Sequence, residues 1–155
     1  MGKRMTKLVS ADDIAIPALL RAARAAYTDA VRRALIETGF DDMPRNGAYV
    51  ISAIGNAGAT MANIIRGLGV TKQAAGQLID TLVLRGYVER RADEEDRRKL
   101  TVTLTTSGEE AAAIIRKAAT AVDTKLKKRV GEKAVAETRK VLFSLIAIAM
   151  GEQPS

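Results

Sequence analysis

The stretch from Thr60 to Leu104 carries the pattern that most limits how this chain can fold. Two short helical patterns stand close together, preceded by Thr60 and Thr71, and a threonine hydroxyl caps a helix by accepting a hydrogen bond from a free backbone N–H. The tight connection between the two patterns suits a helix-turn-helix. Two β-prone runs follow, residues 87–91 and 100–104, on either side of a charged turn. Helix, tight turn, helix and hairpin together predict a winged helix-turn-helix.

The second helical pattern, which begins at Thr71, is the part predicted to read a nucleic acid. Leu78, Ile79, Leu82 and Val83 recur at helical spacing and predict a buried stripe. The second helix of a helix-turn-helix enters the major groove of DNA, and its N-terminal residues reach the base edges. We therefore expect the start of this helix to be the DNA-reading surface.

Four early positions of this helix are predicted to be exposed: Lys72, Gln73, Gly76 and Gln77. A glutamine side chain can form a bidentate pair with adenine, and a lysine favours guanine or phosphate. The small residues at 74–76 would let the backbone approach DNA closely. A solvated helix face is the alternative interpretation, but the order of the surrounding elements favours contact with DNA.

The predicted hairpin carries basic residues that could bind phosphate or enter the minor groove, as wing residues commonly do: Arg90, Arg91, Arg97, Arg98 and Lys99. Residues 93–96 are all acidic and would repel DNA at the tip of the turn. We expect one of Arg97 and Arg98 to pair with an acid and shape the wing, while the other stays free for DNA. Residues 60–104 hold eight basic and six acidic residues, a net charge of only +2 (8 − 6), so folding has to concentrate the positive charge.

Composition favours a nucleic-acid partner over an enzyme. The 155 residues carry a formal charge of +7 and give an isoelectric point of about 9.9, which indicates a polyanionic partner. The chain has no Cys and no His, so disulfides, thiolate metal sites and the commonest general base are excluded. Its paired carboxylates stand at helix starts or turns, where capping explains them. We expect no catalytic site, no metal and no cofactor.

The sequence contains no apolar stretch that approaches the length needed to span a bilayer. Residues 1–9 are basic and lack the apolar core of a signal peptide. We therefore expect a cytoplasmic protein in which residues 1–9 form a basic N-terminal arm.

Upstream of the central pattern, the sequence predicts a long amphipathic helix and a shorter buried one. Residues 10–13 outline a capping box before the long helix, and Gly39 is well placed to end it. Pro44 is placed to start the next helix, because proline is tolerated in the first turn. Residues 55–58 are expected to form a turn.

Downstream, Thr106 and Glu109 form a second capping box that opens another long helix, and Gly131 separates it from a last helix. These terminal helices carry more apolar surface than a small winged-helix core can bury. We expect them to bury the surplus against a second copy of the chain, which predicts a homodimer. The predicted domains are dimerisation helices at 10–39 and 106–150 and a winged helix-turn-helix DNA-binding domain at 44–105.

Two stretches resemble the MarR family of bacterial transcription regulators. Residues 78–90, LIDTLVLRGYVER, look like the family's pattern at the end of the recognition helix and the start of the wing. Residues 96–108, DRRKLTVTLTTSG, look like its wing signature. The resemblance implies a mainly α fold with a small β-hairpin wing, in which the first and last helices interlock in a homodimer.

The family resemblance also implies a function. Such dimers bind pseudo-palindromic operators in double-stranded DNA, usually as repressors, with half-sites about one helical turn apart. Carried over by position, Thr71 caps the recognition helix, Lys72, Gln73 and Gln77 face the groove, and Arg97 and Arg98 belong to the wing. Many members release DNA when a small, often aromatic, anionic effector enters the cleft between the dimerisation helices and the winged helix. Tyr27 and Tyr49 are candidates to contact an effector, with packing in the core as the alternative for both.

A second hypothesis is a protein-interaction module that keeps the winged helix but has lost operator binding. The acidic pair Glu94-Glu95 stands where many family members carry a basic residue, and the small residues at 74–76 replace bulkier ones. Both features favour this alternative and leave insertion of the wing into the minor groove open.

Overall fold

The computed structural model describes residues 10–57, 61–92 and 100–151. The described chain is mainly helical with one two-stranded antiparallel sheet, which confirms the predicted fold class. A short 3-10 helix at Ala11–Asp13 precedes the main elements, which are α1 (Ile16–Glu37), α2 (Gly47–Ala57), α3 (Met61–Leu68), α4 (Lys72–Leu84), β1 (Val88–Ala92), β2 (Leu100–Leu104), α5 (Thr106–Val130) and α6 (Glu132–Met150).

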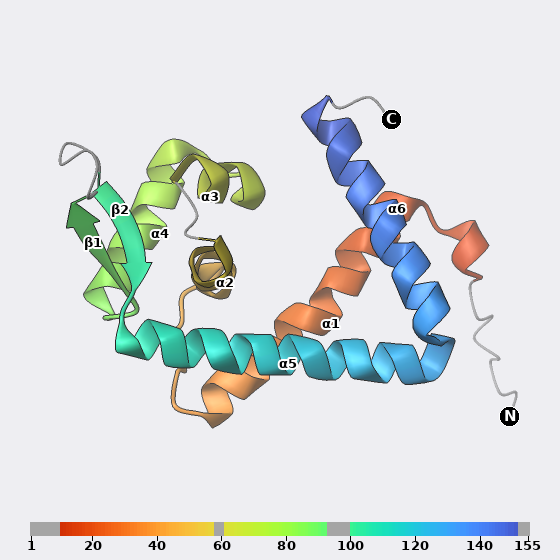
Figure 1. Ribbon diagram of the computed structural model, residues 1–155, viewed down its shortest axis with the longest axis horizontal. Coiled ribbons are helices and arrows are strands. Elements are labelled where there is room, and N and C mark those ends of the chain that lie inside the picture. Colours follow the sequence, from red (N-terminus) through yellow and green to blue (C-terminus); the bar gives the residue numbers. More distant parts are fainter. Residues whose placement is uncertain (1–9, 58–60, 93–99, 152–155) are drawn as a thin grey trace, which may run out of the picture.

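The elements divide into a winged helix and a frame of long helices (Figure 1). Helices α2, α3 and α4 and the β-hairpin lie together above one end of α5, α1 crosses α5, and α6 rises from its other end. One core joins the winged helix to α1 and α5, because all three contribute buried side chains to it: Val31, Leu35, Val50, Ile51, Ile54, Ile64, Ile79, Leu82, Tyr87, Val88, Ala111, Ala112 and Ile115.

Helix α4 forms as the sequence predicts. The Thr71 hydroxyl accepts a hydrogen bond from the Ala74 backbone N–H at 3.2 Å, which is an N-cap. Ile79 and Leu82 are fully buried. The helix ends at Leu84, and Gly86 follows with a positive φ of 76°, a conformation that favours glycine.

The hairpin pairs residues 88–92 with 100–104 in antiparallel register, so that Val88 lies opposite Leu104 and Arg90 opposite Val102. Both strands lie within one residue of their predicted limits. The turn that joins them, with its acids and its three basic residues, lies outside the described residues, as does the predicted cap Thr60.

The boundaries predicted for α2 are wrong at both ends. Asn46 adopts a left-handed φ of 65°, which ends the turn after Pro44, so the helix starts at Gly47 and not at the proline. At the other end, residues 55–57 continue the helix where a turn was expected. Gly55 packs there against α5 and β2: a Cβ built on it would lie 3.4 Å from Leu104 and 3.7 Å from Ala112.

One predicted capping box was misplaced, and the other opens a different helix from the one expected. Thr105, not Thr106, caps α5: its hydroxyl oxygen accepts from the Gly108 N–H at 3.1 Å. The box at Ser10 forms weak contacts, with the Ser10 N–H 3.3 Å from the Asp13 carboxylate, but it opens only the 3-10 helix. The long helix α1 starts later, with Ala15 as a cap that makes no side-chain hydrogen bond and with a proline in the first turn, as expected.

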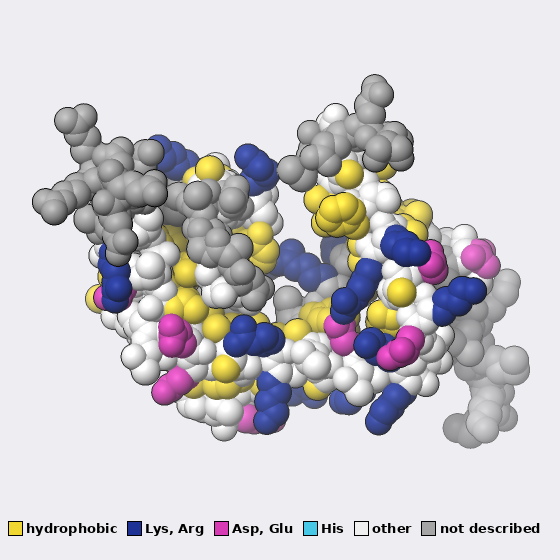
Figure 2. All heavy atoms as spheres, viewed as in Figure 1, with side chains coloured by type: hydrophobic (Ala, Val, Ile, Leu, Met, Phe, Trp, Pro, Cys, Tyr) yellow, Lys and Arg dark blue, Asp and Glu magenta, His cyan; other side chains and the backbone are white. Residues whose placement is uncertain are grey.

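The long helices of the frame leave much apolar surface uncovered. Among residues 132–149 of α6 only Val135 is buried, and the main contacts of α6 within the chain are with α5. Figure 2 shows hydrophobic side chains along α6, across a hollow from the winged helix. Its exposed apolar residues are Val141, Leu142, Phe143, Leu145, Ile146 and Ile148. None of the described helices is long and apolar enough to cross a lipid bilayer.

Candidate nucleic-acid interface

The first turns of α4 present the polar residues that the sequence analysis singled out. Thr71, Lys72, Gln73 and Gln77 are exposed, while Ala75, Ile79 and Leu82 on the opposite side of the helix are fully buried. Because the buried side fixes the rotation of the helix, the two glutamines and the lysine point away from the core. The structure therefore brings these candidates together on one surface.

Gly76 lies at the edge of the same surface. A Cβ built on it would meet nothing within 4 Å, so the fold itself does not require a glycine there. A glycine inside a helix costs roughly 0.5–1 kcal/mol relative to alanine. The absence of a side chain leaves the backbone of α4 open to a molecule that approaches this surface.

The two described basic residues of the hairpin are both paired with acids. Arg90 on β1 forms an ion pair with Asp80 on α4, and Arg91 forms one with Glu89 on the same strand. All four side chains are at least 40% exposed. Exposed pairs of this kind contribute about 1 kcal/mol or less, so a phosphate can replace either acid. The Asp80 pair also connects α4 to β1, the first strand of the hairpin.

The net charge of the described winged helix is modestly positive. Residues 61–92 and 100–104 contain five basic residues (Arg66, Lys72, Arg85, Arg90, Arg91) and two acidic ones (Asp80, Glu89), a net charge of +3 (5 − 2). The candidates Arg97, Arg98 and Lys99 lie outside the described residues, so their partners stay predictions.

Sequence reasoning missed the contacts at the end of α4. The Tyr87 hydroxyl donates to the Asp42 carboxylate, and the Arg85 guanidinium donates to the Asp42 carbonyl oxygen. Burial, helped by the hydrogen bond to Asp42 and its charge, raises the pKa of Tyr87 to about 12. No local sequence pattern predicts a contact between residues 45 positions apart. The only signal was a tyrosine at the start of a strand pattern, which also suits ordinary core packing.

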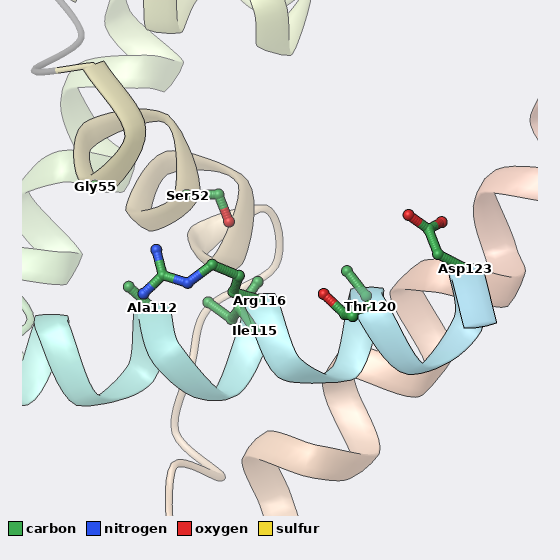
Figure 3. A pocket seen from close by; sticks show the side chains of 8 residues that line it. Ser52, Gly55, Ala112, Ile115, Arg116, Thr120 and Asp123 are labelled. Carbon is green, nitrogen blue, oxygen red and sulfur yellow. The ribbon is translucent and has the colours of Figure 1, made fainter. Parts of the chain in front are cut away.

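A groove of about 200 Å³ lies between α2 and α5 (Figure 3). Ser52 of α2 and Arg116 and Thr120 of α5 supply polar groups, and Asp123 lies farther along α5. The apolar part of the lining comes from Gly55, Ala112, Ile115 and Ala119. Arg116 is exposed and places a cationic group at a partly apolar wall. The sequence analysis did not select any of these residues.

The two tyrosines proposed as effector contacts lie apart from each other. The Tyr27 hydroxyl donates to Asp123 at 2.6 Å, which places it beside one end of the groove but not in its lining, and this hydrogen bond raises the pKa of Tyr27. Tyr49 lies over Gly67 of α3, so closely that a Cβ there would clash with its hydroxyl. The effector role of both residues stays a prediction.

Within residues 10–57, 61–92 and 100–151, no three potential metal ligands gather in one place. The described surface therefore combines an exposed polar helix start with a neighbouring exposed arginine and a separate groove. Such an arrangement suits recognition of a ligand or a nucleic acid by hydrogen bonds and charge.

Comparison with known proteins agrees with this geometry. Residues 41–99 match the sequence model of the MarR family. None of the curated proteins is a detectable relative of the chain by sequence.

Several solved structures share the fold over most of the chain. The reduced form of MarR from Escherichia coli is 23% identical, with a TM-score of 0.65, and the match covers 85% of this chain and 96% of that one. FabT from Streptococcus pneumoniae, solved in complex with DNA, is 21% identical with a TM-score of 0.68, covering 88% and 99%. MepR from Staphylococcus aureus, solved bound to ethidium bromide, is 17% identical with a TM-score of 0.55, covering 90% and 99%.

Proposed function

We propose that the chain is a member of the MarR family of winged-helix transcription regulators, whose sequence model matches residues 41–99, and not an enzyme. In this proposal it binds double-stranded DNA as a homodimer and regulates transcription. The observation that carries this proposal is the exposed start of α4. Lys72, Gln73 and Gln77 face outward there, and side chains of these types pair with guanine, phosphate or adenine in the major groove. FabT, a similar protein, was solved in complex with DNA.

The exposed apolar surface of α6 supports the dimer. Phe143 is 72% exposed and Ile148 is 68% exposed in the single chain. Contiguous apolar patches of this kind are rare on monomeric proteins and usually mark an interface. A second copy of the chain is the partner proposed for this surface, and a symmetric dimer would present two copies of α4 to two related half-sites.

The groove between α2 and α5 supports release of DNA by a small anionic effector. Arg116 supplies a positive charge beside apolar residues such as Ala112 and Ile115, a combination that suits an aromatic acid. The groove touches both the winged helix and the frame, so a molecule bound in it would alter how the two pack. We therefore propose a repressor that leaves its operator when this groove is filled.

A titration of DNA binding against salt tests the proposal. Fluorescence anisotropy with labelled DNA from the region flanking the chain's own gene gives the affinity at each salt concentration. Release of counterions predicts that the logarithm of the association constant falls linearly with the logarithm of salt, by about 0.9 per phosphate contacted. A binding constant that does not change with salt would contradict contact with the DNA backbone.

Two substitutions in α4 test whether the start of this helix is the surface that binds DNA. Gln77→Ala should relax the preference for one base, and Lys72→Ala should weaken binding by about fivefold or more, since one good contact is worth roughly 1 kcal/mol or above. Lys133→Ala is the matched control, because Lys133 is also exposed but lies at the start of α6, far from α4 (Figure 1). If Lys133→Ala weakens binding as much as Lys72→Ala, the DNA-reading surface is not at α4.

A further inference from the structure

The turn between α4 and β1, residues 85–87, receives contacts from both connections between the winged helix and the frame. We call these three residues the joint. The joint follows directly on α4, and it is tied to that helix by hydrogen bonds from the Arg85 N–H to the Thr81 carbonyl at 3.0 Å and from the Tyr87 N–H to the Leu82 carbonyl at 2.9 Å. Any displacement of the joint therefore moves α4 with it.

The first connection is the segment 38–46, which joins α1 to α2. Asp42 of this segment accepts hydrogen bonds from both ends of the joint, from the Tyr87 hydroxyl with its carboxylate and from the Arg85 guanidinium with its carbonyl. The ring of Phe40 packs against the Tyr87 ring with 6.0 Å between their centres. The end of α1 is thus fixed to the end of the reading helix by polar and aromatic contacts.

The second connection is the start of α5. The Thr105 N–H donates to the Tyr87 carbonyl at 3.1 Å, and the Thr105 hydroxyl donates to the Gly86 carbonyl at 2.5 Å. Gly108, in the first turn of α5, lies so close to the Tyr87 carbonyl that a Cβ on it would clash. The joint is therefore held between the segment that follows α1 and the start of α5, and these two helices cross to form the frame.

We propose that Tyr87 is a positioning residue. The hydrogen bond from its hydroxyl to Asp42 sets where α4 lies relative to the frame in each subunit. The positions of the two α4 helices in turn decide which spacing between half-sites the dimer accepts. This inference rests on the proposed function, because only a dimer on two half-sites has a spacing to set. Tyr87 is 3% exposed, so its ring packs in the core while its hydroxyl alone reaches Asp42. Removal of the hydroxyl keeps the ring packed against Phe40 and leaves the Arg85 hydrogen bond in place, but it removes the side-chain hydrogen bond between Tyr87 and Asp42.

The test compares duplexes that differ only in spacing. The reference duplex is the best site that the wild-type protein selects from random DNA, and two others have one base pair added or removed between the half-sites. We expect the wild type to lose at least about tenfold in affinity on both altered duplexes, because one base pair shifts and rotates one half-site relative to the other. Tyr87→Phe should lose no more than about threefold, and Asp42→Ala should behave in the same way. Thr28→Val is the control, because it removes a hydroxyl that forms hydrogen bonds within α1, outside the joint. This variant should lose as much affinity on the altered duplexes as the wild type does.

Three results would overturn the inference. The first is that both Tyr87→Phe and Asp42→Ala lose as much affinity on the two altered duplexes as the wild type does. The second is an equal loss of affinity on all three duplexes, which is what a merely destabilised protein would show. The third is a wild-type dimer that selects no site at all; this result alone would also overturn the proposed function.

Discussion

Gly108 and Gly76 are both helical glycines, yet the structure predicts opposite effects on stability when each is replaced by alanine. A Cβ on Gly108 would collide with the Tyr87 backbone carbonyl, whereas a Cβ on Gly76 would meet nothing within 4 Å. We predict that Gly108→Ala destabilises the protein by about 1–3 kcal/mol, the usual cost of forcing an atom into a packed site. Gly76→Ala should be neutral or stabilise it by up to about 1 kcal/mol, because alanine favours the helix.

Urea denaturation of the two variants measures this difference in free energy of unfolding. The two changes add the same methyl group, so each serves as the control for the other. A Gly108→Ala variant as stable as the wild type would mean that the start of α5 does not pack on Tyr87 as described.

Asp80 is the one acidic residue on the described part of α4, and it neutralises Arg90. We predict that Asp80→Asn raises affinity for non-specific DNA at low salt by about fivefold, since roughly 1 kcal/mol of repulsion is removed and Arg90 becomes free to bind phosphate. Anisotropy with a random duplex measures the change. Glu137→Gln in α6 also breaks an exposed ion pair, with Lys140, but should leave the affinity unchanged. Equal effects of the two substitutions would show that only the net charge matters.

The N-cap of α5 is Thr105, one residue before the cap that the sequence predicted. The Thr105 hydroxyl both accepts from the Gly108 N–H and donates to the Gly86 carbonyl. We predict that Thr105→Ala lowers the free energy of unfolding by about 1–2 kcal/mol, as the loss of an N-cap does. Thr106→Ala, a neighbouring change of the same kind at an exposed position, should cost less than about 0.5 kcal/mol. Thermal or urea unfolding of both variants decides which threonine caps the helix.

Local signals in the sequence were enough to predict some elements. Helix α4 has a capping threonine, an apolar stripe and a glycine after its end, and the hairpin has two runs of β-prone residues, so each could be read without knowledge of distant contacts. The same signals placed Lys72, Gln73 and Gln77 on the exposed side of α4, where the structure has them.

The elements that were misread depend on contacts between distant residues. Residues 55–58 have the composition of a turn, but Gly55 stays helical beside Leu104 and Ala112, which lie far along the chain. The bond between Tyr87 and Asp42 and the groove around Arg116 likewise join segments far apart in the sequence. Periodicity and capping describe one segment at a time, and so they could not predict these features.

For the whole molecule, the exposed apolar surface of α6 predicts dependence on a second copy. Phe143→Glu should weaken the dimer on the order of 100-fold or more, because burial of a phenylalanine contributes about 1.5–3 kcal/mol and a twofold interface contains the side chain twice. Sedimentation equilibrium measures the association. Ala62→Glu is the control, since it adds the same charge at an exposed position of α3, outside α6. A monomeric wild-type protein would contradict the prediction at once.

The positive charge is spread over the whole molecule. The described winged helix carries only part of the net +7, and the helices α1, α5 and α6 together hold 13 basic and 7 acidic residues, a net +6 (13 − 7). We therefore expect the whole dimer to attract DNA and the few side chains at the start of α4 to choose the sequence. Salt should accordingly weaken binding to every duplex, and substitutions in α4 should change which duplex is preferred.

Selection from random duplex DNA by the wild-type protein, followed by sequencing, tests whether α4 reads DNA. We expect enrichment of a motif with twofold symmetry whose half-sites lie about one helical turn apart, and a change of preferred base when Gln77 is replaced by alanine. A protein that is dimeric in solution but enriches no motif would contradict the claim that α4 reads DNA.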